Sequence, residues 1–377
     1  MRGKCTRWAG VAGTLLAAAA AAQDVGLGSP AVAAPGGMAA ASAPPSHVLE
    51  LSGYVIAGGS WVQEDPQFLQ VGHNNGFTLA DARLEITGKP LEQVWVYLSI
   101  DGAVRPADST DLQTARRAVE LKDAYGVWAP GFHLRVQAGQ FKAPQDLEEL
   151  LEETDLHFPT RSIVSAGVTP PYGYAAEGFA LGRQLGVAVG TDAVPLPFGS
   201  LTAQAALTNG NGENHVVNDT QIPSVTGRVS ISFHDVASLG FDGYYQPRAY
   251  GTQPNLFRDD RVGAGADLRI ESHGAHVLLL AAWRKTTHLT TGGPDETATG
   301  FSAEAAYRWR FLEPALRYSA LSPSSVVPAS PVSEFTAALN FYAGNAARLS
   351  ASFAHRGEET GRELSNDSFD LSAQVRF

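Results

Sequence analysis

The sequence has almost no cysteine to build a covalent or thiolate-ligated framework. Its 377 residues include one cysteine, Cys5. Cys5 precedes an uncharged stretch of small residues, Ala9–Ala22, which follows three basic residues. This pattern predicts a secretory signal peptide at residues 1–22 that is removed on export together with Cys5. The exported chain would then hold no disulfide and no cysteine-bound metal.

The sequence also lacks long apolar runs. A membrane helix needs about 20 consecutive apolar residues, and none follows the signal, although 44% of the chain is hydrophobic and only 17% is charged. Residues 23–47 are mainly Ala, Pro, Gly and Ser, which predicts a disordered leader. A chain of this kind can enter a membrane only as strands of a closed barrel, because unpaired backbone groups cannot face lipid.

Basic residues and catalytic motifs are scarce too. Lys and Arg number 27 against 38 Asp and Glu, so no nucleic-acid partner is expected. No phosphate loop, G-x-S-x-G or H-E-x-x-H occurs. His273 and His276 bracket a predicted turn with no third ligand nearby, so we predict no metal site, no cofactor and no enzymatic activity. A hydrolase whose catalytic residues meet only in space leaves no motif, so a barrel lipase or protease stays an open alternative.

From residue 48 onward, the dominant pattern is an alternation of apolar and polar residues. In the last segment Phe369, Leu371, Ala373, Val375 and Phe377 alternate with Ser368, Asp370, Ser372, Gln374 and Arg376. The same phase appears at residues 262–271 and 301–311. Strands of about 9 to 11 residues cross a bilayer when they are tilted. The alternation therefore predicts strands with one face toward lipid and the other toward water.

The connections between these strands alternate in length. Seven short turns and eight long loops link about 16 strands, and both ends lie on the short-turn side. Bacterial barrels have such short periplasmic turns and long extracellular loops. We predict an all-β transmembrane antiparallel β-barrel of about 16 strands over residues 48–377. A secreted, soluble β-rich binding protein is the alternative, because short strands with turn signals would suit it as well.

The third long loop, residues 142–182, is unlike the others. Its acidic opening carries leucines that fit one face of a short helix, and a structureless loop of this length is improbable. We expect it to fold into the barrel and narrow the pore; a solvated helix over the mouth is the alternative. The candidate constriction residues are Lys142, Glu148, Glu149, Glu152, Glu153 and Arg161.

The alternation also assigns charged residues to the lumen, and charged rings decide ion selectivity. The pore-lining candidates are Arg83, Arg135, Arg228, Arg269, Arg308, Arg310, Arg348 and Glu304. One interpretation is an arginine track that passes anions, and the other is a set of paired charges that brace the barrel. The acidic residues of the third loop would repel anions, so the choice between anion and cation selectivity stays open.

Several motifs resemble the phosphate-selective porin O and P family of Gram-negative outer membranes. They are Leu121–Tyr125, Gly139–Lys142 with Pro144, Arg183–Val187, Asn209-Gly210, and Asn366-Asp367 through the terminal Gln374–Phe377. The resemblance implies a 16-stranded barrel, a homotrimer, an inward-folded third loop and diffusion of small anions such as phosphate. The terminal Phe377 resembles the aromatic residue read by the barrel assembly machinery. Such a protein lies among outer-membrane lipid and lipopolysaccharide and lets small hydrophilic solutes or ions diffuse passively.

Overall fold

The computed structural model describes residues 49–377, apart from 74, 105–117, 211, 213, 216, 217, 219, 253, 329 and 360. The expected signal peptide and leader, residues 1–47, lie outside this part of the chain. No helix within it has the length and apolar character needed to cross a bilayer.

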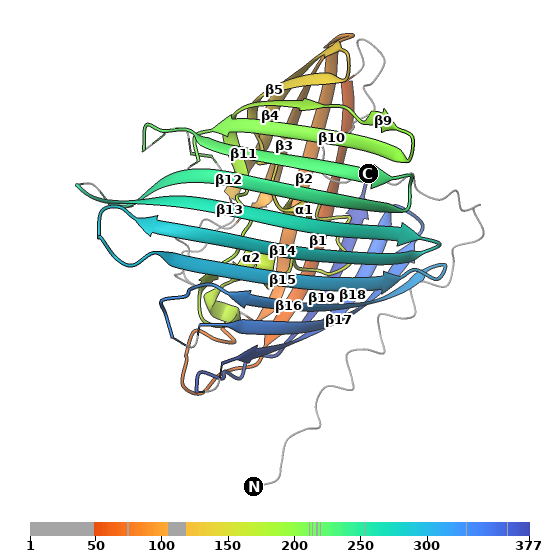
Figure 1. Cartoon of the computed structure of the whole chain (residues 1–377). Coiled ribbons are helices and arrows are strands. Elements are labelled where there is room, and N and C mark those ends of the chain that lie inside the picture. Colours follow the sequence, from red (N-terminus) through yellow and green to blue (C-terminus); the bar gives the residue numbers. More distant parts are fainter. Residues whose placement is uncertain are drawn as a thin grey trace.

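The strands form one closed antiparallel sheet (Figure 1). The sheet contains β1 (Leu49–Val62), β2 (Gly76–Leu91), β3 (Val94–Val104), β4 (Ala118–Gly131), β5 (Leu134–Lys142), β8 (Arg183–Thr191), β9 (Val194–Leu196), β10 (Gly199–Thr208), β11 (Ser224–Phe233), β12 (Ala237–Thr252), β13 (Asn255–Ser272), β14 (Ala275–His288), β15 (Glu296–Tyr307), β16 (Leu312–Ser322), β17 (Val332–Ala343), β18 (Ala347–Glu358) and β19 (Ser368–Arg376). Each strand pairs with its neighbours in the chain, and β19 pairs back onto β1, for example Tyr54 with Arg376. Closure leaves no open edge to face lipid.

β8 and β9 are one barrel strand. Both pair with β10, and a break at Asp192-Ala193 shifts the register by one residue between them. Counting them together leaves sixteen crossings, as the alternation of connection lengths predicts. A barrel of this size is wide enough to keep an aqueous lumen.

The burial pattern of the wall is the reverse of that in a soluble protein. On β16 to β19 the outer face exposes large apolar side chains, including Leu316, Phe335, Phe353 and Val375, each between 45% and 52% accessible. The alternate residues are polar and buried, for example Asn340 at 0%. An apolar outer band with a polar interior is the pattern of a barrel solvated by lipid. The predicted phase is confirmed at Asp267, Arg269, Glu271, Ser302 and Glu304, which alternate with the outward residues of β13 and β15.

Two of the eight expected long loops, at residues 246–260 and 285–298, are shorter than predicted. Residues 246–260 continue β12 and β13 almost to their tip, whereas β14 ends at His288 and β15 begins at Glu296, so residues 289–295 remain a loop. A predicted strand over residues 301–311 is likewise wrong at its end, because β15 stops at Tyr307 and Arg308–Phe311 forms the turn. Arg310 has a φ of 58°, and Trp309 and Leu312 exchange both backbone hydrogen bonds around it. This tight hairpin contains no Gly, Asn or Asp, the residues that normally mark such a turn. The short turn expected at residues 311–313 therefore lies a few residues earlier than predicted.

The connection between β5 and β8, residues 143–182, contains the only helices among the described residues. They are α1 (Leu147–Leu150), α2 (Ile163–Ala166) and the 3₁₀ turn η2 (Pro170–Tyr172), and the strands β6 (Gly167–Val168) and β7 (Ala176–Glu177) form a two-stranded hairpin. We call residues 143–182 the internal segment. Figure 1 draws α1 and α2 within the outline of the wall strands.

Candidate functional site

The internal segment packs on inward-facing side chains of the wall. Three apolar clusters hold it: Leu147 with Leu278 and Leu280 of β14; Phe158 with Ala306, Ala315 and Ala338 of β15 to β17; and Ile163, Val164, Val168 and Phe179 with Ala298, Leu321 and Val332 of the same three strands. Full burial of one such side chain stabilises by about 1.5 to 3 kcal/mol. These contacts explain why the inner face of β14 carries leucines, since the segment covers them.

The residues of the Gly139–Lys142 motif fix the entry to the internal segment. A Cβ atom at Gly139, whose φ is 134°, would lie 2.1 Å from the carbonyl oxygen of Ala124, so only glycine fits there. Gln140 donates its side-chain amide to the carbonyls of Leu121 and Lys122 at 3.0 and 2.8 Å. The backbone N–H of Ala143 donates to the carbonyl of Gly182, which holds the two ends of the segment together.

Inward-facing side chains of the barrel wall donate hydrogen bonds to the backbone of the internal segment. Arg317 of β16 donates to the carbonyls of Thr160 and Arg161 at 2.8 and 3.3 Å. Arg284 of β14 donates to the carbonyl of Gly178 at 2.7 Å, and Arg348 of β18 donates to that of Leu156. Asn340 donates to the carbonyl of His157 at 2.8 Å. The arginines thus satisfy backbone carbonyl acceptors that have no partner within their own element. A carbonyl is neutral, so Arg284 keeps its charge, whereas Arg317 also pairs with Glu334 at 3.3 Å.

The acidic residues of the segment are largely compensated within it. Glu148 is 2% exposed, and its carboxylate accepts the backbone N–H of Ser162 at 2.6 Å and the hydroxyl of the same residue. Arg161 pairs with Glu149 at 3.4 Å and with Glu153 at 2.6 Å. Lys142 donates to the carbonyl of Leu151 at 2.9 Å, and Glu152 lies partly exposed beside it. The expected constriction residues therefore form one compact group, in which Lys142 and Arg161 offset part of the negative charge of the four glutamates.

Several carboxylates of the segment have shifted pKa values, among them Asp146 and Glu177. Burial, reinforced by the negative charge of Glu148, raises the pKa of Asp146 to about 7. Asp146 caps α1 by accepting the backbone N–H of Glu148. Burial alone would raise the pKa of Glu177, but the hydrogen bonds and charge of Arg261, together with the charge of Arg248, lower it to about 2.

Most of the predicted pore-lining arginines have partners on the wall itself. Arg83 pairs with Asp81 at 3.1 Å, and Arg228 pairs with Asp242 and Asp267 at 3.2 and 2.7 Å. Arg269 pairs with Glu271 on its own strand. These three buried or half-buried arginines match the bracing interpretation better than that of a free anion track.

The other predicted residues lie nearer the periplasmic end. Arg135 pairs with Asp192 and lies over the ring of Trp95. Arg308 lies at the β15–β16 turn over the ring of Tyr342, at 3.9 Å, and Arg310 is exposed at the tip of that turn. The lumen assignment of Arg310 is therefore wrong, because the strand ends before it. Glu304 faces inward and lies 3.2 Å from His276.

A basic cluster on three adjacent strands was missed from the sequence. Arg248 of β12, Arg261 of β13 and Arg284 of β14 surround Glu177 of β7. Arg261 donates to both carboxylate oxygens of Glu177 at 2.7 Å, and Arg248 donates to the same group at 3.0 Å. Arg284 lies over the ring of Phe179 and donates to the next carbonyl along the segment. Arg261 continues the inward phase of Asp267 and Arg269, which would have identified it had the strand been extended.

The model of the family described as phosphate-selective porin O and P matches residues 62–246. This range includes the motifs that begin at Leu121, Gly139, Arg183 and Asn209, whereas the motifs at the C-terminus lie beyond it. None of the curated proteins compared with the chain matches it.

Solved porins and other outer-membrane proteins share the fold. The anion-selective porin from Comamonas acidovorans has a TM-score of 0.63 and 13% identity, over 88% of this chain and 100% of that one. The outer membrane channel DcaP of Acinetobacter baumannii has a TM-score of 0.59 and 12% identity, over 88% and 98%. The loop L8 deletion mutant of OmpT from Vibrio cholerae has a TM-score of 0.59 and 9% identity, over 88% and 100%. At these identities the likeness is one of fold.

The resemblance drawn from the motifs is thus confirmed by the family match, and the closed sixteen-stranded barrel agrees with it. The chain is a Gram-negative outer-membrane porin, a channel for passive diffusion of solutes, and the family that its sequence matches over residues 62–246 is phosphate-selective porin O and P.

Proposed function

We propose that this porin favours small anions, including phosphate, and that the basic cluster of Arg248, Arg261 and Arg284 produces the preference. The cluster has three guanidinium groups and one carboxylate, Glu177. The buried Asp259 lies opposite Arg248 and acts on Arg261, so the formal charge of the group with Asp259 included is +1. It lies on the inner face of adjacent strands, where a permeating ion passes. The side chain of Arg248 is 33% accessible, which leaves part of this charge open to solution.

The competing charge is that of the acidic internal segment. Glu149 and Glu153 pair with Arg161, and Glu148 is buried away from solution. Paired charges at short range attract a distant ion weakly, because their fields oppose each other. We therefore expect the partly exposed Arg248 and its neighbours, rather than the partly offset acidic group, to determine the sign of selectivity. The family and the fold are typical of channels rather than enzymes, and they favour the channel over a lipase or protease.

Planar-bilayer recording across a KCl gradient tests this proposal through the reversal potential. In water, the interaction energy between one unit charge and an ion in contact with it is about 1 kcal/mol. This energy corresponds to about a fivefold change in the anion-to-cation permeability ratio. Arg248→Ala should lower that ratio by about this factor. The combined replacement of Arg248, Arg261 and Arg284 by Ala leaves the charge of Glu177 uncompensated. This variant should reverse the sign of the reversal potential, from anion to cation preference.

Arg258→Ala is the matched control, because Arg258 lies exposed on the outer side of β13. It should leave the reversal potential unchanged. Added phosphate should reduce the chloride current of the unaltered channel and reduce it less in Arg248→Ala. A cation-selective unaltered channel, or equal effects of the Arg248 and Arg258 replacements, would refute the proposal.

We extend the proposal to assembly as a homotrimer among outer-membrane lipid and lipopolysaccharide. The support is the family resemblance and a structural neighbour, OmpT of Vibrio cholerae, described in its trimer form with a TM-score of 0.57 and 8% identity over 88% of this chain. The mass of the detergent-solubilised complex tests the trimer. Phe377, 67% exposed at the end of the last strand, is the proposed signal for the barrel assembly machinery. Deleting it should lower the amount of folded barrel in the outer membrane.

A further inference from the structure

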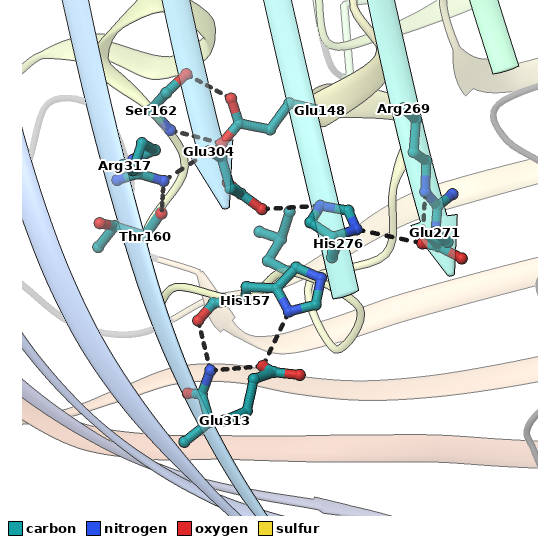
Figure 2. A network of polar contacts seen from close by, with 12 residues as sticks. Glu148, His157, Thr160, Ser162, Arg269, Glu271, His276, Glu304, Glu313 and Arg317 are labelled. Carbon is teal, nitrogen blue, oxygen red and sulfur yellow. Dashed lines mark hydrogen bonds and ion pairs between the residues drawn. The ribbon is translucent and has the colours of Figure 1, made fainter. Parts of the chain in front are cut away.

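Two histidines and a glutamate from distant parts of the chain meet on the inner wall (Figure 2). His157 comes from the internal segment, His276 from β14 and Glu304 from β15. One possible ligand atom of each residue lies within 4.8 Å of those of the other two. The imidazole rings are close, with centroids 4.1 Å apart. Among the described residues, this is the group of histidine and carboxylate side chains whose spacing suits a metal ion.

A second carboxylate orients each imidazole. Nδ1 of His157 lies 2.9 Å from Glu313, and Nδ1 of His276 lies 3.3 Å from Glu271. An Nδ1–H that donates to a carboxylate leaves the lone pair on Nε2. Figure 2 shows the second nitrogen of His276 directed at Glu304, with the ring of His157 beside that of His276. Metal-bound histidines are held by carboxylates in the same way.

The orienting carboxylates are themselves fixed. Glu313 accepts hydrogen bonds from Asn340 and Tyr342, each at 2.9 Å, and Glu271 pairs with Arg269. These bonds keep Glu271 and Glu313 from swinging into the site as ligands. They leave Glu304 as the carboxylate available to an ion.

The Nε2 atom of His276 needs a cation beside it. It is buried, and its neighbour is a carboxylate oxygen of Glu304 at 3.2 Å. A nitrogen lone pair and a carboxylate oxygen repel at this distance unless a positive charge lies between them. That charge is either a proton on His276 or a metal ion shared by the two groups.

We propose that this cluster binds one divalent transition-metal ion of the zinc class through Nε2 of His157, Nε2 of His276 and the carboxylate of Glu304. Imidazole nitrogen and carboxylate oxygen suit zinc and its neighbours, and two histidines with one glutamate leave a fourth position for water. With bonds of about 2.0 to 2.1 Å, tetrahedral ligand atoms lie about 3.4 Å apart. His157 lies outside any regular strand or helix, so it is the residue that moves inward.

A bound ion would tie the internal segment to the wall. His157 belongs to the segment, whereas His276 and Glu304 belong to adjacent strands of the barrel. Their strand ends are near the turns His273-Gly274 and Arg308–Phe311, so the site lies toward the short-turn end of the barrel. The inference does not rest on anion preference, since binding can be measured on protein in detergent.

Titration calorimetry of the purified full-length barrel with ZnCl₂ at pH 7.5 tests the site. We expect saturable binding with one ion per chain. His276→Ala and His157→Ala should each weaken binding by at least about tenfold, and Glu313→Gln should weaken it by about 10- to 100-fold although it supplies no ligand atom. His355→Ala is the control, because His355 is 65% exposed on the outer face of β18 and pairs with Asp367. It should leave affinity and stoichiometry unchanged.

Copper provides a readout that needs no variant. Electron paramagnetic resonance of the unaltered protein with one equivalent of Cu²⁺ should show coupling to two imidazole nitrogens. Absence of saturable zinc binding, or equal binding after replacement of both His157 and His276, would overturn the proposal in favour of a proton on His276. If the variants fail to form heat-modifiable barrels, the copper spectrum decides, and a spectrum without imidazole coupling refutes the site.

Discussion

Replacing Arg317 by methionine should free the internal segment while the barrel stays closed. Arg317 is 2% exposed on β16, and its guanidinium donates to two carbonyls of the segment and lies 4.5 Å from the ring of Phe158. The acidic neighbours keep other partners after the change. Glu334 retains Arg356 at 2.8 Å, and Glu148 retains Ser162. The replacement therefore removes anchoring without leaving a bare buried carboxylate.

The replacement removes the two hydrogen bonds from Arg317 to the carbonyls of the segment. A hydrogen bond to a charged group contributes about 1.5 to 3 kcal/mol to stability. Methionine keeps an apolar contact with the ring of Phe158. We therefore expect the free energy for local opening of the segment to fall by about 3 kcal/mol, which raises the open population about 100-fold.

Thiol labelling measures that population, because the only natural cysteine lies in the expected signal peptide. Ser165 of α2 is 1% exposed, so Ser165→Cys should react with a charged thiol reagent only when the segment opens. In this background, Arg317→Met should accelerate labelling about 100-fold. Arg269→Met, which removes an arginine paired with Glu271, should not. Equal rates with and without Arg317, or equal acceleration in the control, would show that this residue does not hold the segment.

Two further outcomes are expected. Leu147→Ala, at a side chain that is 0% exposed, should lower the free energy of segment opening by about 2 to 5 kcal/mol in the same labelling assay, and an unchanged rate would show that the cluster with Leu278 and Leu280 is dispensable. For Asp146, the folded pKa of about 7 lies above the ordinary 3.8, so the folded chain holds a proton that the unfolded chain releases between these values. Its contribution to stability is therefore greatest at low pH and falls as pH rises to about 7. Asp146→Asn should remove that component from the urea midpoint measured between pH 4 and pH 8, and identical pH profiles would contradict the assigned pKa.

The alternation of side chains predicted the fold well because period two depends only on which side of the sheet meets lipid. It placed Arg228, Arg269 and Glu304 on the inner face, where the structure has them. It failed at Arg310, because the short turn expected at residues 311–313 lies earlier, between Trp309 and Leu312, and carries no glycine or asparagine. Without such a residue, the local pattern locates a turn only to within a few residues.

The candidate sites could be predicted less well because they depend on contacts between distant segments. Arg248 lay in residues assigned to a loop, and its partner Glu177 lies in β7 of the internal segment. His276 was considered only with His273, its neighbour in sequence, yet the structure places it beside His157. Such pairings are set by how the internal segment docks on the wall, and no spacing within one strand encodes that docking.

The docking itself explains why the wall is rich in buried arginine. The internal segment has little regular structure, so many of its carbonyls lack partners within their own element. Arginine offers five donors in a rigid fork, which suits the irregular carbonyls of Thr160, Arg161 and Gly178. Since a carbonyl is neutral, Arg284 holds the segment and keeps its positive charge at the lumen. Anchoring and electrostatics are therefore coupled at Arg284, whereas Arg248, whose side chain is 33% accessible, acts mainly through its charge.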